Sequence, residues 1–428
     1  MDYPMASIVI PTYNRCEMLV AAVDSALKQD YPNLEIIVSD NCSNDDTENQ
    51  MKKYAGQVKY YRQQENLGSI KNIEFVARNC SGKYFLLLCD DDCILDPYYI
   101  RDAVTLFEQN DTMNMVGSDC YYYYTENQTS RYADSGCGYR KCFRSEEFFK
   151  QYWTNNRMNG NKFFSLSSIN LVIRKESFLN LDLSFDPKLF SLDCEFIFKL
   201  SLSGDVGYLA KPCIQYTVHG DNEACRLSLK DLKYSFRFIN HVAAYMIKMG
   251  HGDPETKTWV KNTVFRLFYI ITHHDTAGIA ENYNSYTLYR EIVENELDMD
   301  LLGDAFKQEM LFFYPNLFKR IFRDHKRIGI YGTGEHTEKM INMYHCVNGN
   351  SDGIEFVYFD SDKSKIGNDY LGSRIYNLQD ISDLGITVIV ISSFAFQNEI
   401  FEGIRYLLND GFKIERIYED YDTNVFTY

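Results

Sequence analysis

The sequence predicts an α/β protein with a mostly parallel sheet, followed by a helical region and a second, smaller α/β domain. Strand and helix signals alternate over the first hundred residues and again from Arg327 onwards, which is the pattern of parallel sheets with crossover helices. Between these two stretches the strand signals disappear. The length of 428 residues, at roughly 150 per domain, suggests about three domains. We therefore predict three parts, residues 1–228, 229–325 and 326–428.

Within the first part, apolar and β-branched runs mark the strands, and apolar residues at helical spacing mark the helices. The predicted strands are residues 7–10, 35–39, 58–62, 84–88, 171–173 and 214–218. The predicted helices are residues 19–26, 70–77 and 194–202. The strand at 84–88 is apolar throughout, as expected for a strand buried on both faces of a parallel sheet. Residues 118–160 show a poor pattern.

Amphipathic helices dominate residues 229–324, and strands return at 327–331, 355–359 and 387–391. The chain carries 44 Lys and Arg against 60 Asp and Glu, a net charge of −16. Nucleic-acid binding requires a basic face, so a nucleic-acid partner is not expected. No apolar run is long enough for a transmembrane segment, and the start lacks the pattern of a secretory signal. With 12 scattered cysteines, these features predict a cytoplasmic protein with reduced thiols.

Three adjacent carboxylates, Asp90, Asp91 and Asp92, follow directly on the apolar strand at 84–88. The carboxyl end of a parallel strand is where α/β sheets bind ligands. Adjacent carboxylates repel one another and remain ionised when a cation lies among them. Oxygen ligands favour Mg²⁺ or Mn²⁺ over zinc. The alternative is a solvated acidic loop that caps the next helix.

Four further motifs precede the acidic triplet in order: residues 7–15, 35–41, 65–68 and 77–79. Together with the triplet they resemble the family 2 glycosyltransferases, which have the GT-A fold, over residues 5 to about 225. The resemblance implies a Rossmann-like, mostly parallel catalytic domain that uses a sugar nucleotide. It implies donor binding by Pro11, Thr12, Tyr13, Arg15, Asp40, Asn66, Gly68, Arg78, Asn79, Asp90 and Asp91.

In that family the segment matching Pro11 to Tyr13 lines the base, and the acid matching Asp40 binds uracil. The residues matching Arg78 and Asn79 lie near the ribose and the donor sugar. The family usually has two acids where this chain has Asp40 and then Asn41, so only the first acid is present. For Asn66, Gly68, Arg78 and Asn79, turn and cap chemistry is the alternative.

The resemblance implies metal binding by Asp92, with Asp90 and His219 as further ligands. Members often have an arginine two residues before this histidine, where this chain has Thr217. A histidine without a ligand role at the end of a strand is therefore the alternative for His219.

The resemblance also implies a general base at Asp193, in the motif of residues 192–196. A carboxylate can take the proton from an attacking hydroxyl. The alternative role for Asp193 is to cap the following helix. Glu195 is then expected on the solvent side of that helix, and it is the next candidate for the base.

In the last part, Gly332 and Gly334 follow a strand and precede a helix, and Asp360 ends the next strand. This order resembles a dinucleotide-binding fingerprint. However, Thr337 replaces the third glycine, and Glu335 brings negative charge to the helix start, where a pyrophosphate would bind. A degenerate Rossmann-like module for packing or protein contact is therefore favoured over an NAD-dependent oxidoreductase.

Taken together, the sequence predicts a metal-dependent, inverting glycosyltransferase with Mn²⁺ or Mg²⁺ as cofactor. The donor is expected to be UDP-N-acetylglucosamine or another UDP-hexose. The acceptor is a hydroxyl of a surface glycan or of a protein such as flagellin. The rival hypothesis is a non-catalytic scaffold that binds a sugar nucleotide.

Overall fold

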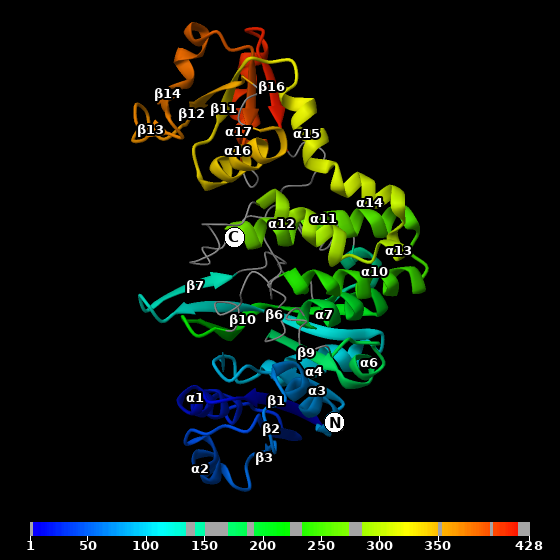
Figure 1. The fold of residues 1–428 in the computed structure, drawn as a ribbon. Coiled ribbons are helices and arrows are strands. Elements are labelled where there is room, and N and C mark those ends of the chain that lie inside the picture. Colours follow the sequence, from blue (N-terminus) through cyan, green and yellow to red (C-terminus); the bar gives the residue numbers. More distant parts are fainter. Residues whose placement is uncertain are drawn as a thin grey trace. The chain divides into compact units, whose positions relative to one another are not determined.

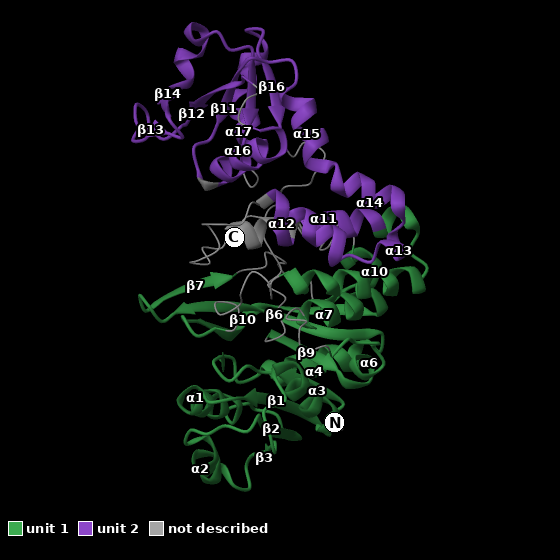
Figure 2. Ribbon diagram, viewed as in Figure 1, with its two compact units in different colours: residues 1–256 green, residues 257–428 purple. Residues whose placement is uncertain are grey.

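The structure, a computed structural model, describes residues 3–133, 142–149, 170–185, 192–222, 233–273, 285–349, 353–393 and 397–417. Two compact units divide the chain, residues 1–256 and 257–428 (Figure 2). The predicted boundary at residue 228 lies outside the described residues, and the one at 326 directly precedes the first strand of the second sheet.

Unit 1 is built on a ten-stranded sheet in the order β3-β2-β1-β4-β9-β6-β10-β5, with β7 paired to β6 and β8 to β10 (Figure 1). The first four of these strands are parallel, β9 is antiparallel to both of its neighbours, and β6 is parallel to β10. The strands are β1 (Ala6–Thr12), β2 (Leu34–Asp40), β3 (Lys59–Arg62), β4 (Tyr84–Leu87), β5 (Cys93–Ile94), β6 (Met113–Tyr124), β7 (Thr129–Ala133), β8 (Cys142–Phe143), β9 (Leu171–Arg174) and β10 (Asp205–Val218). The expectation of a Rossmann-like, mostly parallel catalytic sheet is confirmed.

Helices cover both faces of this sheet because successive strand residues point to opposite sides. Ile8 and Ile10 belong to one apolar core with α1 (Cys16–Ala26) and α4 (Tyr99–Gln109). Val9 belongs to the other, with α3 (Ser69–Asn79), α6 (Lys175–Leu179) and α7 (Leu192–Ser203). Unit 1 also contains α2 (Thr47–Met51), α5 (Ser145–Phe148), α10 (Phe238–Lys248) and 3₁₀ helices at Lys52–Tyr54 and Ser235–Arg237.

The register of the parallel strands brings their carboxyl ends to one edge. Thr12 lies opposite Asp40, and Asp40 lies opposite Arg62. The backbone N–H of Leu88 donates to the carbonyl of Val9, so the chain after β4 leaves the sheet beside the end of β1. The acidic triplet is therefore adjacent to the segment that follows β1.

Unit 2 combines helices with a six-stranded sheet in the order β13-β14-β12-β11-β15-β16. The strands β14-β12-β11-β15-β16 are parallel and follow the 3-2-1-4-5 order of a doubly wound fold. Its elements are α11 (Asp253–His273), which begins at the end of unit 1, α12 (Ser285–Asn295), α13 (Met299–Leu302), α14 (Asp304–Leu311), α15 (Phe313–Phe322), β11 (Arg327–Tyr331), α16 (Glu335–Asn348), β12 (Glu355–Phe359), β13 (Asp369–Tyr370), β14 (Ser373–Tyr376), β15 (Val388–Ile391), α17 (Gln397–Ile404), β16 (Lys413–Arg416) and 3₁₀ helices at Leu378–Leu384 and Arg405–Leu408.

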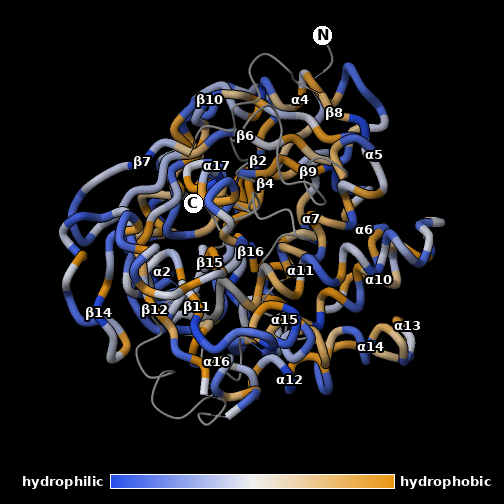
Figure 3. The backbone as a smooth tube through the Cα atoms, turned by 90° about the horizontal axis from the view of Figure 1, so that it is seen from above, coloured by the Kyte–Doolittle hydropathy of each residue, from blue (hydrophilic) through white to orange (hydrophobic). Residues whose placement is uncertain are grey.

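Aromatic rings join the helices of unit 2 to its sheet. Phe322 of α15 packs edge-on against Tyr344 of α16 and Phe356 of β12, with centroids 4.8 and 5.6 Å away. Hydrophilic residues interrupt the helices of the chain throughout (Figure 3). No described helix has an apolar stretch long enough to cross a membrane.

Candidate active site

Asp90 links the ends of β1 and β4. Its Oδ2 accepts a hydrogen bond from the Thr12 hydroxyl at 2.7 Å, and its Oδ1 accepts one from Arg15 at 3.1 Å. The side chain is buried, which raises the pKa of this carboxyl to about 6 despite the opposing effects of Thr12 and Arg15. Thr12 and Arg15 therefore hold the first acid of the triplet in place from the neighbouring strand.

Asp91 is the centre of a polar network in which three side chains converge on its Oδ2. Arg15 donates at 2.8 Å, His219 Nε2 lies at 3.1 Å and Asn222 donates at 3.3 Å. The Nδ1 of His219 accepts the backbone N–H of Asp221 at 3.1 Å, so Nε2 carries the ring proton and donates to Asp91. His219, predicted as a metal ligand, here donates a hydrogen bond to Asp91.

Asp92 is almost inaccessible, at 1% exposure. Its Oδ1 accepts the backbone N–H of Thr217 at 2.7 Å, whereas its buried Oδ2 has no hydrogen-bond partner. Burial and the neighbouring charge of Asp91 raise the pKa of Asp92 well above its ordinary value. A buried carboxylate oxygen without a donor is costly, and a cation would offset that cost.

A divalent ion fits this cluster in charge and in donor atoms. Arg15, which pairs with Asp90 and Asp91, brings one positive charge to the three carboxylates of the triplet, which leaves two negative charges if all three are ionised. One oxygen each of Asp91 and Asp92 and the Sγ of Cys89 lie within 4.8 Å of one another. Asp90, predicted as a ligand, is not part of this group, and its oxygens accept hydrogen bonds from Thr12 and Arg15. Cys89 was not among the predicted residues.

At the end of β2, Asp40 is fully buried rather than open to a ligand. Its Oδ1 accepts the backbone N–H of Ser43 at 2.8 Å and its Oδ2 accepts the Tyr60 hydroxyl at 2.5 Å, with Arg62 at 3.5 Å. The carboxylate thus shapes the loop after β2. Pro11 and Tyr13 lie at the same edge, and Tyr13 is 42% exposed.

Asn66 and Gly68 form the turn before α3. Asn66 Oδ1 accepts the side-chain amide of Asn41 and the backbone N–H of Gly68. Gly68 has φ +83° and precedes α3, a conformation that favours glycine. In the first turns of α3, Asn72 is buried and donates to the carbonyl of Ser39. A single asparagine in a helix gave no signal for this role in the sequence.

Arg78 and Asn79 are not brought to this site. They end α3, which leads to the start of β4 rather than to its carboxyl end. Arg78 pairs with Glu74 at 2.9 Å, and Asn79 donates to the carbonyl of Phe75. The structure therefore gives these two side chains helix-surface partners and does not place them by the triplet.

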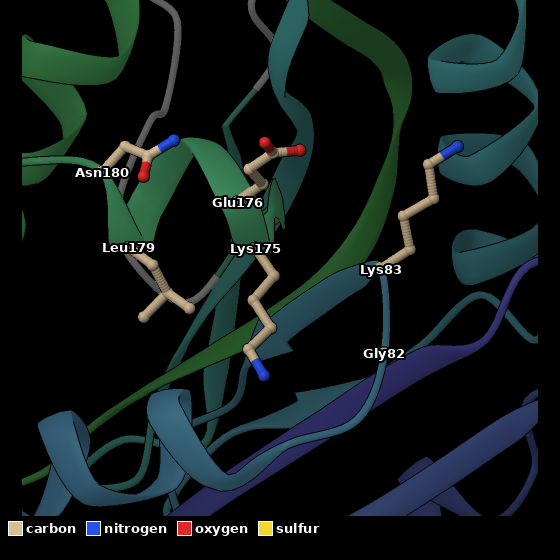
Figure 4. A pocket seen from close by; sticks show the side chains of 6 residues that line it. All are labelled: Gly82, Lys83, Lys175, Glu176, Leu179 and Asn180. Carbon is tan, nitrogen blue, oxygen red and sulfur yellow. The ribbon is translucent and has the colours of Figure 1, made fainter.

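A pocket of about 330 Å³ lies near this opposite edge of the sheet, lined by Gly82, Lys83, Lys175, Glu176, Leu179 and Asn180 (Figure 4). The ammonium groups of Lys83 and Lys175 point in different directions (Figure 4). Lys83 pairs with Glu108, and Lys175 donates to the backbone carbonyl of Cys80. Both cations are used by the protein itself, and the pocket is separate from the carboxylate cluster.

Asp193 is the second residue of α7, and it lies within electrostatic reach of the cluster. Burial raises the pKa of the Cys89 thiol well above its ordinary value, and the charges of Asp92, Asp91, Asp90 and Asp193 raise it further. The carboxylate of Asp193, half-buried at the start of α7, therefore acts electrostatically on the same thiol as the acidic triplet.

Glu195 does not lie on the solvent side of α7, and that expectation is wrong. Its side chain is fully buried and pairs with the buried Lys199 at 2.6 Å. The spacing of i and i+4 places Glu195 and Lys199 on one face of the helix, and that face packs inward.

The comparisons with known proteins agree with this geometry. Residues 7–178 match the family described as Glycosyl transferase family 2. The amino-terminal part of this chain is a member of glycosyl transferase family 2. The prediction of that family is confirmed. The family 2 region is 35% identical over 115 residues to an uncharacterized glycosyltransferase of Rickettsia felis, covering 26% of this chain and 19% of the relative. It is 36% identical over 96 residues to GalNAc(5)-diNAcBac-PP-undecaprenol beta-1,3-glucosyltransferase of Campylobacter jejuni, covering 22% and 31%.

The family 2 fold also matches solved structures. TarS 1–349 of S. aureus, solved in complex with UDP-GlcNAc, superimposes with a TM-score of 0.56 at 14% identity, over 74% of this chain and 91% of that one. This likeness shows a GT-A fold. The chain spans 19% to 35% of the length of the first curated relatives that it matches.

A second family, described as C2185-like, N-terminal, matches residues 324–415. In this region the glycine-rich turn after β11 is held by its own neighbours. Asp360 Oδ2 accepts the backbone N–H of Thr333 at 3.0 Å, and Thr337 Oγ1 lies 2.7 Å from Ser392 Oγ. The polar groups at the carboxyl ends of β11, β12 and β15 thus bind one another.

Proposed function

We propose that this protein is an inverting glycosyltransferase that moves a sugar from a UDP-sugar to an acceptor hydroxyl. The observation that carries the proposal is that the charges of Asp193 and of the acidic triplet all act on one group, the thiol of Cys89. Asp193 and the acidic triplet come from segments about a hundred residues apart in the sequence. Their proposed functions are complementary: Asp193 takes a proton, and the triplet holds an ion. Membership of the amino-terminal region in glycosyl transferase family 2 supports this assignment.

In the proposed reaction the acceptor oxygen attacks the anomeric carbon as the bond to the diphosphate breaks. Asp193 takes the hydroxyl proton, which makes the oxygen a stronger nucleophile in the transition state. Asp91 and Asp92 would hold a divalent ion, which supplies positive charge to the departing diphosphate when bound. Arg15, fixed by Asp90 and Asp91, adds a further positive charge at the same place.

The donor nucleotide is proposed to be uridine diphosphate, which is the ligand of TarS in the related fold. N-acetylglucosamine or another hexose is the proposed sugar. The acceptor is proposed to be a hydroxyl of a surface glycan or a protein, and the module at residues 326–428 is proposed to recruit it or a partner protein.

A panel of UDP-sugars incubated with the full chain and Mn²⁺ tests the proposal by release of UDP. Turnover of at least one donor is expected, together with its loss in Asp193→Asn. If the protein is a non-catalytic scaffold, calorimetry would show that it binds a UDP-sugar. No UDP would then be released, even after addition of a cell extract that contains candidate acceptors. Glu17→Gln, an exposed acid in the first turn of α1, is the matched control for the change of charge.

A further inference from the structure

A sulfur atom stands beside the carboxylates of the proposed ion site. The Sγ of Cys89 lies within 4.8 Å of one oxygen of Asp91 and one of Asp92, and these two oxygens also lie within 4.8 Å of each other. Three atoms that are no more than 4.8 Å apart share a point within about 2.8 Å of each of them. Metal–oxygen bonds of about 2.1 Å and metal–sulfur bonds of about 2.3 Å therefore need inward shifts of at most about 0.7 Å for all three atoms to bind one ion.

Two independent features show that ligand positions remain available. The Oδ2 of Asp92 is buried and has no hydrogen-bond partner. Arg15, His219 and Asn222 all contact the Oδ2 of Asp91, which leaves the Oδ1 of Asp91 as the oxygen for an ion. Hydrogen bonds therefore orient the carboxylates of Asp91 and Asp92, but they do not use every oxygen of these two side chains.

Cys89 is held in this position by the sheet. It follows Leu88, whose N–H donates to the carbonyl of Val9 at 3.0 Å, and it packs half-buried against the core of α1 and α4. The next three residues are the acidic triplet. The backbone of Cys89 is therefore anchored beside β1 through its neighbour Leu88.

We propose that Cys89 ligates the divalent ion through its thiolate, together with Asp91 and Asp92. Because sulfur is a soft ligand and Mg²⁺ binds oxygen, a thiolate ligand selects Mn²⁺, Co²⁺ or Zn²⁺ over Mg²⁺. On binding, the Cys89 S–H bond breaks, its proton passes to solvent and a sulfur–metal bond forms. This inference rests on the ion site of the proposed function and narrows its cofactor from Mn²⁺ or Mg²⁺ to the softer ions.

Cobalt binding to the full chain, measured without donor or acceptor, tests this proposal. A Co²⁺–thiolate bond gives a near-ultraviolet charge-transfer band, and we expect that band in the wild type, its loss in Cys89→Ser and its retention in Cys93→Ser. Cys93 is the matched control, since it also flanks the triplet but its neighbour is Ser25. Stoichiometric Co²⁺ binding without the band, or a band that survives Cys89→Ser, would overturn the proposal.

A second measurement uses only wild-type Cys89 and so does not depend on the folding of that variant. Alkylation by iodoacetamide, mapped by mass spectrometry, is expected to be slower at Cys89 when Mn²⁺ or Co²⁺ is present, and unchanged by Mg²⁺ at the same concentration. Equal alkylation of Cys89 with and without Co²⁺ would contradict direct ligation. Because neither readout involves sugar transfer, a failure here is distinguishable from a failure of the proposed enzymatic activity.

Discussion

Glu195 and Lys199 form an ion pair of 2.6 Å inside α7, and their side chains are only 0% and 3% exposed. The second carboxylate oxygen of Glu195 lies 3.1 Å from Nδ1 of His241 on α10, and Ser184 donates its backbone N–H to Oε1. The helix that begins with Asp193 is therefore fixed by a buried charge network. Glu195 positions this helix, and Asp193 remains the candidate for proton transfer.

Replacing Glu195 by Ala should destabilise unit 1, because Lys199 would be left as a buried charge without its partner. Breaking a buried pair in this way costs about 3–5 kcal/mol, measurable by urea unfolding. The matched control is Glu74→Ala, since Glu74 pairs with Arg78 at the same i, i+4 spacing on the exposed surface of α3. That change should cost about 0.2–1 kcal/mol. Equal losses in the two variants would contradict the assigned role of the Glu195 network.

Asp193→Asn separates proton transfer from binding. The amide keeps the shape of the side chain but cannot accept the acceptor proton, so transfer should fall roughly 10²- to 10⁴-fold. Donor affinity, measured by calorimetry, should change little because the acidic triplet and Arg15 are untouched. An unchanged rate of UDP release on acceptor addition would exclude Asp193 as the base.

The sequence predicted the position of the acidic triplet because two local signals coincide there. An apolar run of strand length ends at Leu88 and three carboxylates follow, so the chemistry lies at a strand end in any parallel arrangement. The contact of Thr12 with Asp90 also follows from the parallel pairing of β1 and β4. These features can be predicted because they depend only on residues that are adjacent in the sequence or paired across neighbouring strands.

Residues whose roles depend on packing could not be predicted in this way. Contacts between α7 and α10 decide that the side of α7 with Glu195 packs inward. The charge of Glu195, taken from the sequence alone, predicts instead that this side faces solvent. Residues 121–124 are four tyrosines that close the 12-residue strand β6. They show no alternation of apolar and polar residues, so the sequence does not predict the strand β6, which lies between β9 and β10 in the sheet. Likewise, the direction of α3 carries Arg78 away from the triplet.

Removing divalent ions should abolish turnover and weaken UDP binding. Without an ion, the carboxylates of Asp91 and Asp92 repel a diphosphate at short range. Calorimetry of UDP binding with and without EDTA measures this directly, and Asp92→Ala should reproduce the effect of the chelator. Asp111→Ala, at an exposed acid, serves as the control. UDP affinity that neither EDTA nor Asp92→Ala alters would contradict an ion at the triplet.

Glu35 should make folding stability depend on pH. Burial raises the pKa of this carboxyl, but hydrogen bonds from Lys59, Ser7 and the backbone of Ser81 outweigh burial and hold the pKa below its ordinary value. A carboxyl with a lowered pKa stabilises the fold above its unfolded pKa, about 4.3, and loses this contribution as the pH falls through the folded value.

The comparison of wild type with Glu35→Gln isolates this effect. The variant should lose about 1.5–3 kcal/mol of stability at neutral pH, with the difference shrinking below about pH 4. The exposed pair of Glu108 with Lys83 provides the control Glu108→Gln, expected to change stability by less than about 1 kcal/mol. If the difference in unfolding free energy between wild type and Glu35→Gln stays constant down to acidic pH, Glu35 does not stabilise the fold through its charge.

No NAD(H) or NADP(H) binding is expected at the glycine-rich turn of unit 2. Gly332, with φ +105°, provides a tight turn, but the acid that would meet a ribose is already used, since Asp360 binds Thr333 and Lys365. Thr337 occupies the position of the third glycine, and its Oγ1 lies 2.7 Å from the Oγ of Ser392, the residue that follows β15. A cofactor would have to break these contacts before it could lie on the start of α16.

A titration of the full chain followed by NADH fluorescence tests this directly. No saturable enhancement is expected for the wild type. Thr337→Gly, which restores the glycine of the fingerprint, is expected to leave the result unchanged because Asp360 remains bound to Thr333. Micromolar NADH binding that disappears in Gly334→Val would overturn this prediction and favour an oxidoreductase activity in unit 2, since a valine at Gly334 would block the approach of a pyrophosphate to the backbone.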